Sequence, residues 1–316
     1  MKMKKILIPA VFWISTLLSG QVLRVGFWNV ENLFDLVDDL GTRDEEFALG
    51  GKKNVTQEIY ELKLRNSASV LQDIDADIMG LCEVENYLVL DDLNQKVLSR
   101  KYKIVHFDSP DERGIDNALL YDPEVFHFLK SRAIQNQLPS GDLTRDILYV
   151  QGTYQGNSLH IFINHWPSNY GGKEQAIPKR SSTARLLANE IGKILSENLD
   201  AEIVVLGDFN EDPTDQNVKM LQSVNMVNLM KPMMETPHTG TYVWRGNDHF
   251  YDQVIISQGL RDDRGLQANK AAILDKSIYR QQEGKYAHYP FRFWAGDKLL
   301  GGYSDHLPVF VEINAK

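Results

Sequence analysis

The sequence has only one cysteine, Cys82, among 316 residues, so no disulfide can form within the chain and packing must supply its stability. It also lacks internal repeats, low-complexity tracts and Pro/Ser-rich linkers, which argues against a repeat protein or a string of small domains. Basic residues are outnumbered, with 34 Lys and Arg against 43 Asp and Glu. This imbalance argues against a broad basic face for DNA, although positive charge focused in one place would still suit a nucleic acid.

A hydrophobic run of comfortable membrane-spanning length is also missing. The apolar run Ile6–Leu18 is shorter than the roughly 20 residues that a spanning helix needs. Lysines precede this run and the small pair Ser19–Gly20 follows it, which is the pattern of a secretory signal peptide and not of a membrane anchor. We therefore expect residues 1–20 to be removed, Gln21 to begin a mature domain of residues 21–316, and the protein to be secreted or periplasmic. The mature domain then carries 31 basic and 43 acidic residues, a net charge of −12.

The mature sequence alternates between strand-like and helix-like stretches. Nearly continuous Val, Ile and Leu runs predict strands that are buried on both faces. These runs are Val22–Phe27, Ile78–Leu81, Ala118–Tyr121, Leu159–Ile163, Ile203–Leu206, Val254–Ile256 and Pro308–Ile313. Apolar stripes at helical spacing lie in 59–74 and 186–195, and the polar stretches 35–55 and 259–302 read as long loops. The pattern predicts one α/β domain with a sheet core and helices outside.

Polar or ionisable residues follow several of these strand runs directly. Asn29, Glu83, His165 and the segment Gly207-Asp208-Phe209-Asn210 each come just after an apolar run. Strand ends are where loops present side chains on a rigid base, so we interpret these residues as parts of one site. Any single cluster could be an ordinary polar loop, but four with catalytic residue types favour function. Asp208 and Asn210 are two apart and can point to the same side of an extended chain.

Two further segments carry acidic residues and a histidine. In Ser304-Asp305-His306, adjacent side chains alternate between faces, so Asp305 suits a metal ion while His306 suits a water or a phosphate. Asp252 precedes a buried strand and needs a partner there, for which a histidine is a good candidate. Glu83 offers oxygen ligands to a hard cation, with Glu85 as a rival two residues on.

One local basic cluster lies after the His165 loop, formed by Lys173, Lys179, Arg180 and Arg185. It can be read as a solvated helix start or as a patch that steers phosphate into the site. The sequence leaves both readings open.

Taken together, these residues resemble the endonuclease/exonuclease/phosphatase superfamily, which includes deoxyribonuclease I, exonuclease III-type abasic-site nucleases, bacterial sphingomyelinases and inositol polyphosphate 5-phosphatases. The resemblance covers Val25 to Val311, and its motifs are Trp28-Asn29, Glu83, Gly207–Asn210 and Ser304–His306. It implies an α/β fold of two packed mixed β-sheets with helices on the outer faces, the four-layer sandwich of deoxyribonuclease I. Cys82 stands where the family often has Gln, and a histidine at 165 replaces the tyrosine of the exonuclease III-type branch, which argues against abasic-site repair.

The resemblance also implies a role for each motif residue. Asn29 and Glu83 would hold Mg²⁺, with Mn²⁺ or Ca²⁺ as alternatives, and Asp305 would lie nearby or coordinate. Asp208 would position or deprotonate the attacking water and Asn210 would bind the phosphate. His306, held by Asp252, would contact the phosphate or act as base, and His165 would be a second catalytic histidine. The family pattern leaves open whether Asp208 or His306 activates the water.

A family-like segment, Asp111–Ala118, adds two weaker assignments. Asp116 would pair with His165 and Arg113 would touch phosphate, and Arg180 of the basic cluster joins them as a substrate-binding residue.

The predicted function is an exported, metal-dependent, nuclease-like phosphodiesterase, which acts on DNA or RNA by in-line attack of water. We expect a monomer without membrane insertion after signal removal. One alternative keeps the mechanism and changes the substrate to a phospholipid head group, an inositol phosphate or another phosphomonoester. A non-catalytic binding module is the alternative from another class, but no expected metal or phosphate residue is lost.

Overall fold

A computed structural model describes residues 22–316 of the protein. The predicted signal peptide, residues 1–20, and the predicted mature N-terminus at Gln21 lie outside the described residues. No helix within 22–316 combines the length and the apolarity that crossing a bilayer would require.

Two six-stranded mixed sheets form the centre of the molecule, as the family resemblance implied. In the first sheet only β1 and β2 run parallel, and in the second only β7 and β8 do. The first sheet has the order β13 (Leu266–Ile273), β16 (Val309–Ala315), β1 (Leu23–Leu33), β2 (Ile78–Val84), β4 (Asp116–Tyr121), β3 (Lys103–His106). The second has the order β5 (His127–Gln137), β6 (Leu143–Tyr154), β7 (Asn157–His165), β8 (Glu202–Asp208), β12 (Asp252–Ser257), β9 (Met226–Asn228).

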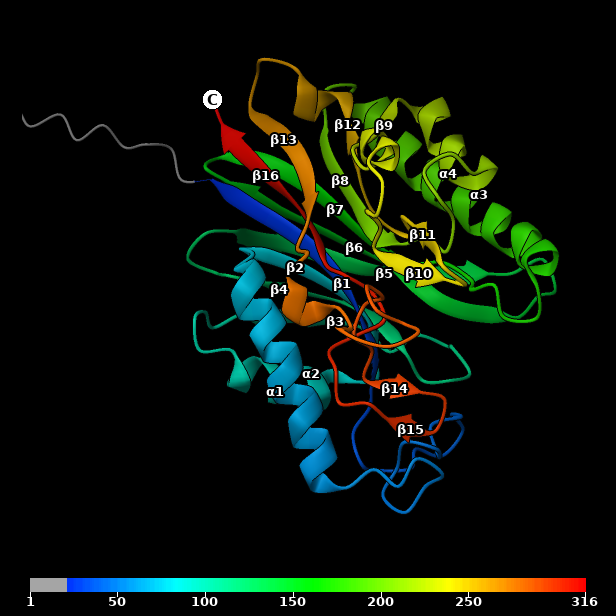
Figure 1. The fold of residues 1–316 in the computed structure, drawn as a ribbon. Coiled ribbons are helices and arrows are strands. Elements are labelled where there is room, and N and C mark those ends of the chain that lie inside the picture. Colours follow the sequence, from blue (N-terminus) through cyan, green and yellow to red (C-terminus); the bar gives the residue numbers. More distant parts are fainter. Residues whose placement is uncertain (1–21) are drawn as a thin grey trace, which may run out of the picture.

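The helices lie on the outer faces of the two sheets (Figure 1). The α-helices are α1 (Gln57–Ile74), α2 (Tyr87–Lys96), α3 (Lys173–Glu197) and α4 (Gln216–Met220). The described residues also form the 3₁₀ turns η1 (Leu221–Val224), η2 (Lys231–Glu235), η3 (Gln258–Arg261) and η4 (Ser277–Tyr279). Small hairpins pair β10 (Tyr242–Trp244) with β11 (Asn247–His249) and β14 (Trp294–Ala295) with β15 (Lys298–Leu299). The result is the four-layer arrangement that the resemblance implied.

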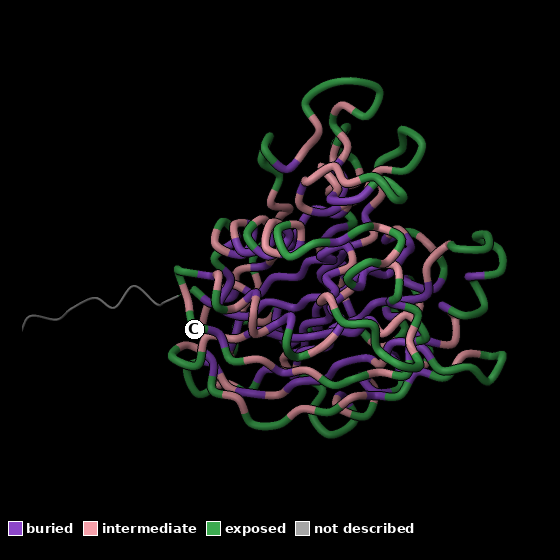
Figure 2. The backbone as a smooth tube through the Cα atoms, turned by 90° about the horizontal axis from the view of Figure 1, so that it is seen from below, coloured by how far each residue is buried: buried purple, intermediate pink, exposed green. Residues whose placement is uncertain are grey.

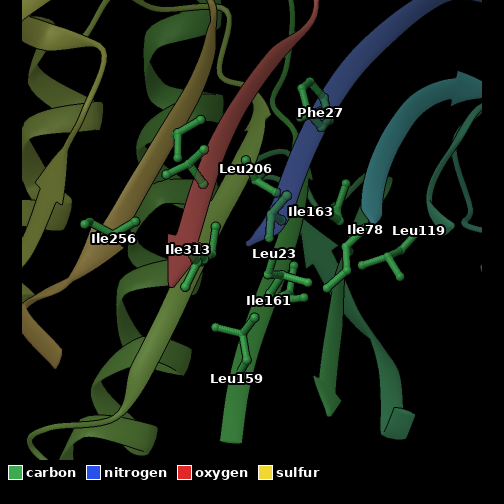
Figure 3. Packing of buried hydrophobic residues seen from close by; sticks show 14 of the residues in the cluster. Leu23, Phe27, Ile78, Leu119, Leu159, Ile161, Ile163, Leu206, Ile256 and Ile313 are labelled. Atoms are coloured by element: carbon green, nitrogen blue, oxygen red, sulfur yellow. The ribbon is translucent and has the colours of Figure 1, made fainter. Parts of the chain in front are cut away.

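Strand alternation explains why the apolar runs are nearly continuous. Val25 and Phe27 point between the sheets, while Trp28 and Val30 of the same strand pack against α1 and its neighbours. Figure 3 shows the inner layer, where side chains from strands of both sheets meet. Burial follows the same division, with buried residues in the middle layers and exposed ones in the loops (Figure 2). The core therefore fixes both sheets rigidly behind the loops at their ends.

Helix starts follow local capping chemistry. Thr56 accepts a hydrogen bond from the backbone N–H of Ile59 at the start of α1, and Asn86 does the same for α2 through Leu88 and Val89. The prediction of one long loop at 259–302 was partly wrong, because the segment contains β13. This strand pairs with the last strand, β16, so its partner could not be read from the local sequence.

Candidate active site

Three predicted site residues lie side by side on adjacent strands of the second sheet. His165 ends β7, Asp208 ends β8 and Asp252 begins β12. His165 is the register partner of Asp208 in the parallel pair, and Asp208 is the partner of Asp252 in the antiparallel pair. The register of the sheet alone thus brings these side chains together at one end of the strands.

The first sheet contributes residues from the ends of β1 and β2, where the backbone is irregular. The β1–β2 register shifts after Asn29, and Glu31, Asn32 and Glu83 have left-handed φ angles of 56°, 53° and 61°. Asn210, beyond β8, has φ of 50°. Left-handed non-glycine residues cost about 1–3 kcal/mol each and cluster at functional sites. Here the strained residues include two predicted site residues, Glu83 and Asn210.

The strand ends of the two sheets and the loops that follow them enclose a cleft of about 480 Å³, which we call the reaction cleft. Six predicted site residues line it: Glu83, His165, Asp208, Asn210, Asp305 and His306. Asp252 is fully buried behind His306. Asn29 is buried next to the cleft, where its Nδ2 donates to Asp208 Oδ2 at 3.1 Å. Residues far apart in sequence therefore share one cavity.

His306 lies between two carboxylates. Its Nδ1 is 2.7 Å from Asp252 Oδ2, and its Nε2 is 3.8 Å from Asp208 Oδ2. Burial alone would lower the pKa of His306, but the charges of Asp252 and Asp208 outweigh it and raise that pKa well above its ordinary value. The predicted partnership of Asp252 with a histidine is present, and it favours a protonated His306.

His165 is in a different electrostatic setting. Its Nε2 lies 3.7 Å from Asp208 Oδ2 and 3.8 Å from Glu83 Oε1, and its buried Nδ1 has no hydrogen-bond partner among residues 22–316. Burial, with the charges of Arg145 and Arg113, lowers the pKa of His165 well below its ordinary value. The cleft therefore holds one neutral and one charged imidazole, a separation of the kind that assigns different proton-transfer roles.

Asp208 is held at both oxygens. Oδ1 accepts the backbone N–H of Asn210 at 2.9 Å, and Oδ2 accepts Asn29 Nδ2. Burial raises the pKa of Asp208 to about 6, with His306 opposing and Asp252 adding to the shift. The Asn210 side chain in turn donates to the carbonyl of Trp166 at 3.1 Å, which ties the β8 and β7 loops together. These bonds fix the orientation of the carboxylate in the cleft.

Asp305 forms an ion pair with Arg292 at the other side of the cleft. Arg292 also lies near the buried Glu31, whose carboxylate accepts the backbone N–H groups of Phe293 and Trp294. The buried Lys63 donates to the carbonyls of Val30 and Tyr303. This network connects the loop that carries Asp305 to β1 and α1.

Arg180 does not reach the reaction cleft, which corrects its assignment to substrate binding. Its side chain is 0% exposed, and its Nε donates to Glu211 Oε1 at 2.8 Å. Nη1 donates to the carbonyl of Pro167 at 2.9 Å, in the loop after His165. A buried guanidinium cannot meet a phosphate in solution, so Arg180 supports the His165 loop from behind.

The expected pairing of Asp116 with His165 is also wrong. Asp116 is buried and lies 2.9 Å from His106 Nε2, while its other oxygen accepts bonds from Ser109. Arg113 lies outside the reaction cleft, in a neighbouring cleft of about 760 Å³ that continues from it past Ser168 and Tyr170. A substrate longer than one phosphate ester could reach Arg113 there.

A model of the endonuclease/exonuclease/phosphatase family matches residues 24–315, nearly all of the described chain. The chain belongs to the endonuclease/exonuclease/phosphatase family. It is accordingly an enzyme of the phosphoric ester hydrolase class. No curated protein matches it in sequence.

Solved structures confirm the family fold at low sequence identity. Truncated TDP2 from Caenorhabditis elegans is 17% identical, with a TM-score of 0.62 over 93% of this chain and 98% of that one. D. rerio TDP2 complexed with single strand DNA product is 17% identical, with a TM-score of 0.59 over 93% and 99%. A Bacteroides thetaiotaomicron mannosyl-6-phosphatase is 16% identical, with a TM-score of 0.60 over 92% and 99%.

The reaction cleft suits the divalent cation that this family generally uses. The carboxylates of Glu83, Asp208 and Asp305 line it, and hard cations prefer such oxygen ligands. Only Asp305 among them is paired with an arginine. Elsewhere in the described chain, two groups of three side chains each bring their ligand atoms within 4.8 Å of one another. One group is His106, Asp108 and Asp116, and the other is Asp39, Asp44 and Glu85. Glu85 therefore lies in an acidic cluster outside the cleft and is no rival to Glu83 for this site.

Several residues of the site had no clear sequence signal. Tyr242 packs its ring 4.7 Å from that of His306 and bridges to it through the backbone. Arg145 donates to Asp111 and to the carbonyl of Trp166. Their positions depend on how distant segments pack, which no local pattern of the sequence encodes.

Proposed function

We propose that this family member is an exported, divalent-metal-dependent phosphodiesterase that hydrolyses nucleic acid with an activated water. The observation that carries the proposal is the convergence of Asp208, His165 and the Asp252–His306 pair on one cleft, with Glu83 and Asp305 beside them. Carboxylates, one charged imidazole and one neutral imidazole supply the groups that in-line attack on phosphorus requires.

Each residue has a role that its contacts support. Asp252 and Asp208 flank His306 and keep it protonated, so His306 donates to the phosphate or to the leaving oxygen. Asp208, fixed at both oxygens, is left to align the attacking water and to accept its proton. His165 and Asn210 line the same cleft and bind the phosphate oxygens as neutral donors.

Glu83 and Asp305 are the residues that would hold the cation, and Asn29, whose Oδ1 accepts the backbone N–H of Glu31 at 3.0 Å, lies buried next to the cleft as a further oxygen ligand. A bound divalent cation polarises a phosphoryl oxygen and offsets the charge that develops in the transition state. Arg292 would keep Asp305 in place, since the two side chains form an ion pair.

A phosphomonoesterase that acts on a phosphosugar is the second candidate. It is supported by the likeness to the mannosyl-6-phosphatase, and it would use the same catalytic residues. The structure of D. rerio TDP2 with single strand DNA product supports the nucleic-acid proposal in the same way.

A substrate panel tests the proposal and separates the candidates. Plasmid DNA, RNA, a single-stranded oligonucleotide, sphingomyelin, mannose 6-phosphate and bis-p-nitrophenyl phosphate would each be incubated with Mg²⁺, Mn²⁺ or Ca²⁺. We expect turnover of the nucleic acids and of bis-p-nitrophenyl phosphate. Hydrolysis of mannose 6-phosphate alone would favour the second candidate. For export, mass spectrometry of protein from the native cell should find Gln21 at the N-terminus, and a retained Lys2 would contradict it.

A further inference from the structure

A second pocket, of about 630 Å³, opens directly beside the reaction cleft. The two share Tyr242, Trp244 and Asp305 as lining residues. One wall of the pocket is the β10–β11 hairpin and the other is the segment 281–300. We call it the aromatic pocket, because its lining includes Tyr242, Trp244, Tyr286 and Tyr289. A group attached to a phosphate in the reaction cleft would enter it.

The rings of this pocket are unusually accessible for their size. Trp244 is 53% exposed and Tyr286 is 49% exposed, whereas large aromatic side chains are mostly covered in a folded protein. Exposed rings around a concavity mark a binding surface more often than a gap in packing. The aromatic pocket therefore offers flat faces to a ligand.

Two cations lie over these rings without acidic partners. Arg245 lies 5.6 Å from the ring centre of Trp244, and Lys285 lies 5.3 Å from that of Tyr286. Neither forms an ion pair with a residue within 22–316. In a mature chain with a net charge of −12, two unpaired cations at one pocket focus positive charge where an anionic ligand would lie.

The backbone of the β10–β11 hairpin is held in place, so this wall of the pocket needs little backbone ordering on binding. Thr241 N donates to His249 O at 2.8 Å, and Leu307 N donates to Thr241 O at 2.8 Å, which fastens the hairpin beside His306. Arg245 and Gly246 at the hairpin tip have φ of 49° and 85°, as a tight hairpin turn requires. A preformed surface loses less free energy on binding than a mobile one.

We propose that the aromatic pocket binds the bases next to the hydrolysed phosphate, and that the substrate is single-stranded nucleic acid. The proposal rests on the proposed function of the reaction cleft. Single-strand binding sites combine cations for the backbone with aromatic rings on which bases stack. A duplex keeps its bases stacked on one another and cannot present their faces to Trp244 or Tyr286.

The same lining argues against a sugar in this pocket. Neutral sugars stack on aromatic rings as bases do, but they also need hydrogen bonds to their several hydroxyl groups. Asp305 is the only carboxylate among the described residues that line the pocket, and it forms an ion pair with Arg292. Gln281 is the one amide side chain there. The scarcity of free acceptors in the lining, and not its ring faces, therefore favours bases and phosphates over a sugar.

Binding of two short single-stranded oligonucleotides tests the proposal, measured by fluorescence anisotropy in a chelator so that nothing is hydrolysed. One is oligothymidylate, and the other has the same length and phosphates but abasic sugars. We expect the oligothymidylate to bind at least about tenfold more tightly, and Trp244→Ala or Tyr286→Ala to remove most of that difference, as expected for the loss of one stacked base. Arg245→Ala should reduce the slope of log affinity against log salt by about 0.7, the effect of one phosphate contact on a single strand.

Tyr87→Ala is the matched control, because Tyr87 is also half exposed, at 52%, but begins α2 and lines neither the reaction cleft nor the aromatic pocket. It should bind as the wild type does. Equal binding of the two oligonucleotides, or unchanged binding by both pocket variants, would overturn the inference.

Turnover of bis-p-nitrophenyl phosphate with Mg²⁺ by the wild-type protein reports separately on the reaction cleft. If that ester is hydrolysed but bases make no difference to binding, the inference fails and the proposed function stands. If bases matter but no ester in the panel is hydrolysed, the proposed function fails, and the substrate role of the pocket fails with it.

Discussion

Replacing Arg180 with methionine tests whether this residue supports the fold or binds substrate. Methionine keeps an unbranched side chain of similar reach but removes the charge. The change leaves Glu211 buried with Asn217 as its remaining side-chain donor, and leaves the carbonyl of Pro167 without its guanidinium. Breaking a buried ion pair at one partner costs about 3–5 kcal/mol. In a domain of this size, at roughly 2–4 °C per kcal/mol, Tm should fall by about 6–20 °C.

Thermal unfolding measured with matched variants separates the two roles. Arg185→Met, on the exposed side of the same helix, should leave Tm within about 2 °C, since surface changes are worth about 0.5 kcal/mol or less. Arg180→Met combined with Glu211→Met should recover most of the loss, because apolar replacement of a whole buried pair is close to neutral. If Arg180→Met kept its Tm and only raised KM for a polyanionic substrate, the structural role would be refuted.

Two further predictions concern the paired and acidic residues. Asp252→Asn and His306→Ala should each lower kcat at least about a hundredfold. The double variant should be little worse than His306→Ala alone, because the effects of residues that act as a unit are non-additive. Multiplicative losses in steady-state kinetics would remove Asp252 from the catalytic unit. Burial raises the pKa of Glu85 to about 8, with the charge of Asp44 adding to the shift and the backbone N–H of Asp35 opposing it. The folded state therefore holds a proton that the unfolded chain loses near pH 4.5, and stability falls as pH rises from about 4.5 to 8. Glu85→Gln should therefore raise Tm more at pH 8 than at pH 5, by at least about 2 °C, and a pH-independent difference would contradict this origin.

The layered fold could be predicted because its signals are local. Runs such as Ile161–Ile163 and Val204–Leu206 are apolar at every position because both faces of their strands are covered, and that pattern appears in the sequence itself. Strand ends were predictable for the same reason. Asp208 follows its run after a single glycine, Gly207, so the topology had only to bring such strand ends together.

The errors concern side chains whose partners are distant or whose helical face was not considered. Arg180 lies among exposed basic residues in sequence, yet it shares the buried face of α3 with Thr183, Ala184, Leu187 and Ile191 at helical spacing. Extending that stripe towards the N-terminus would have indicated its burial.

Asp116 and Tyr242 show the other limit of sequence reading. Asp116 bonds to a histidine on the neighbouring strand β3, and Tyr242 meets His306 across a bridge between distant segments. Both contacts depend on register and tertiary packing, which a local pattern does not encode.

We expect the reaction cleft to use a divalent cation to hydrolyse phosphate esters, and the decisive measurement is the turnover of chelator-treated protein. Protein stripped of metal should hydrolyse bis-p-nitrophenyl phosphate at less than about 1% of the rate restored by Mg²⁺, since a polarising cation and a positioned base are each worth at least about a hundredfold. Mg²⁺ should also raise Tm of the wild type but not of Glu83→Gln, because a ligand that binds only the folded state stabilises it. Full turnover in the chelator, with no change in Tm on adding metal, would contradict the account.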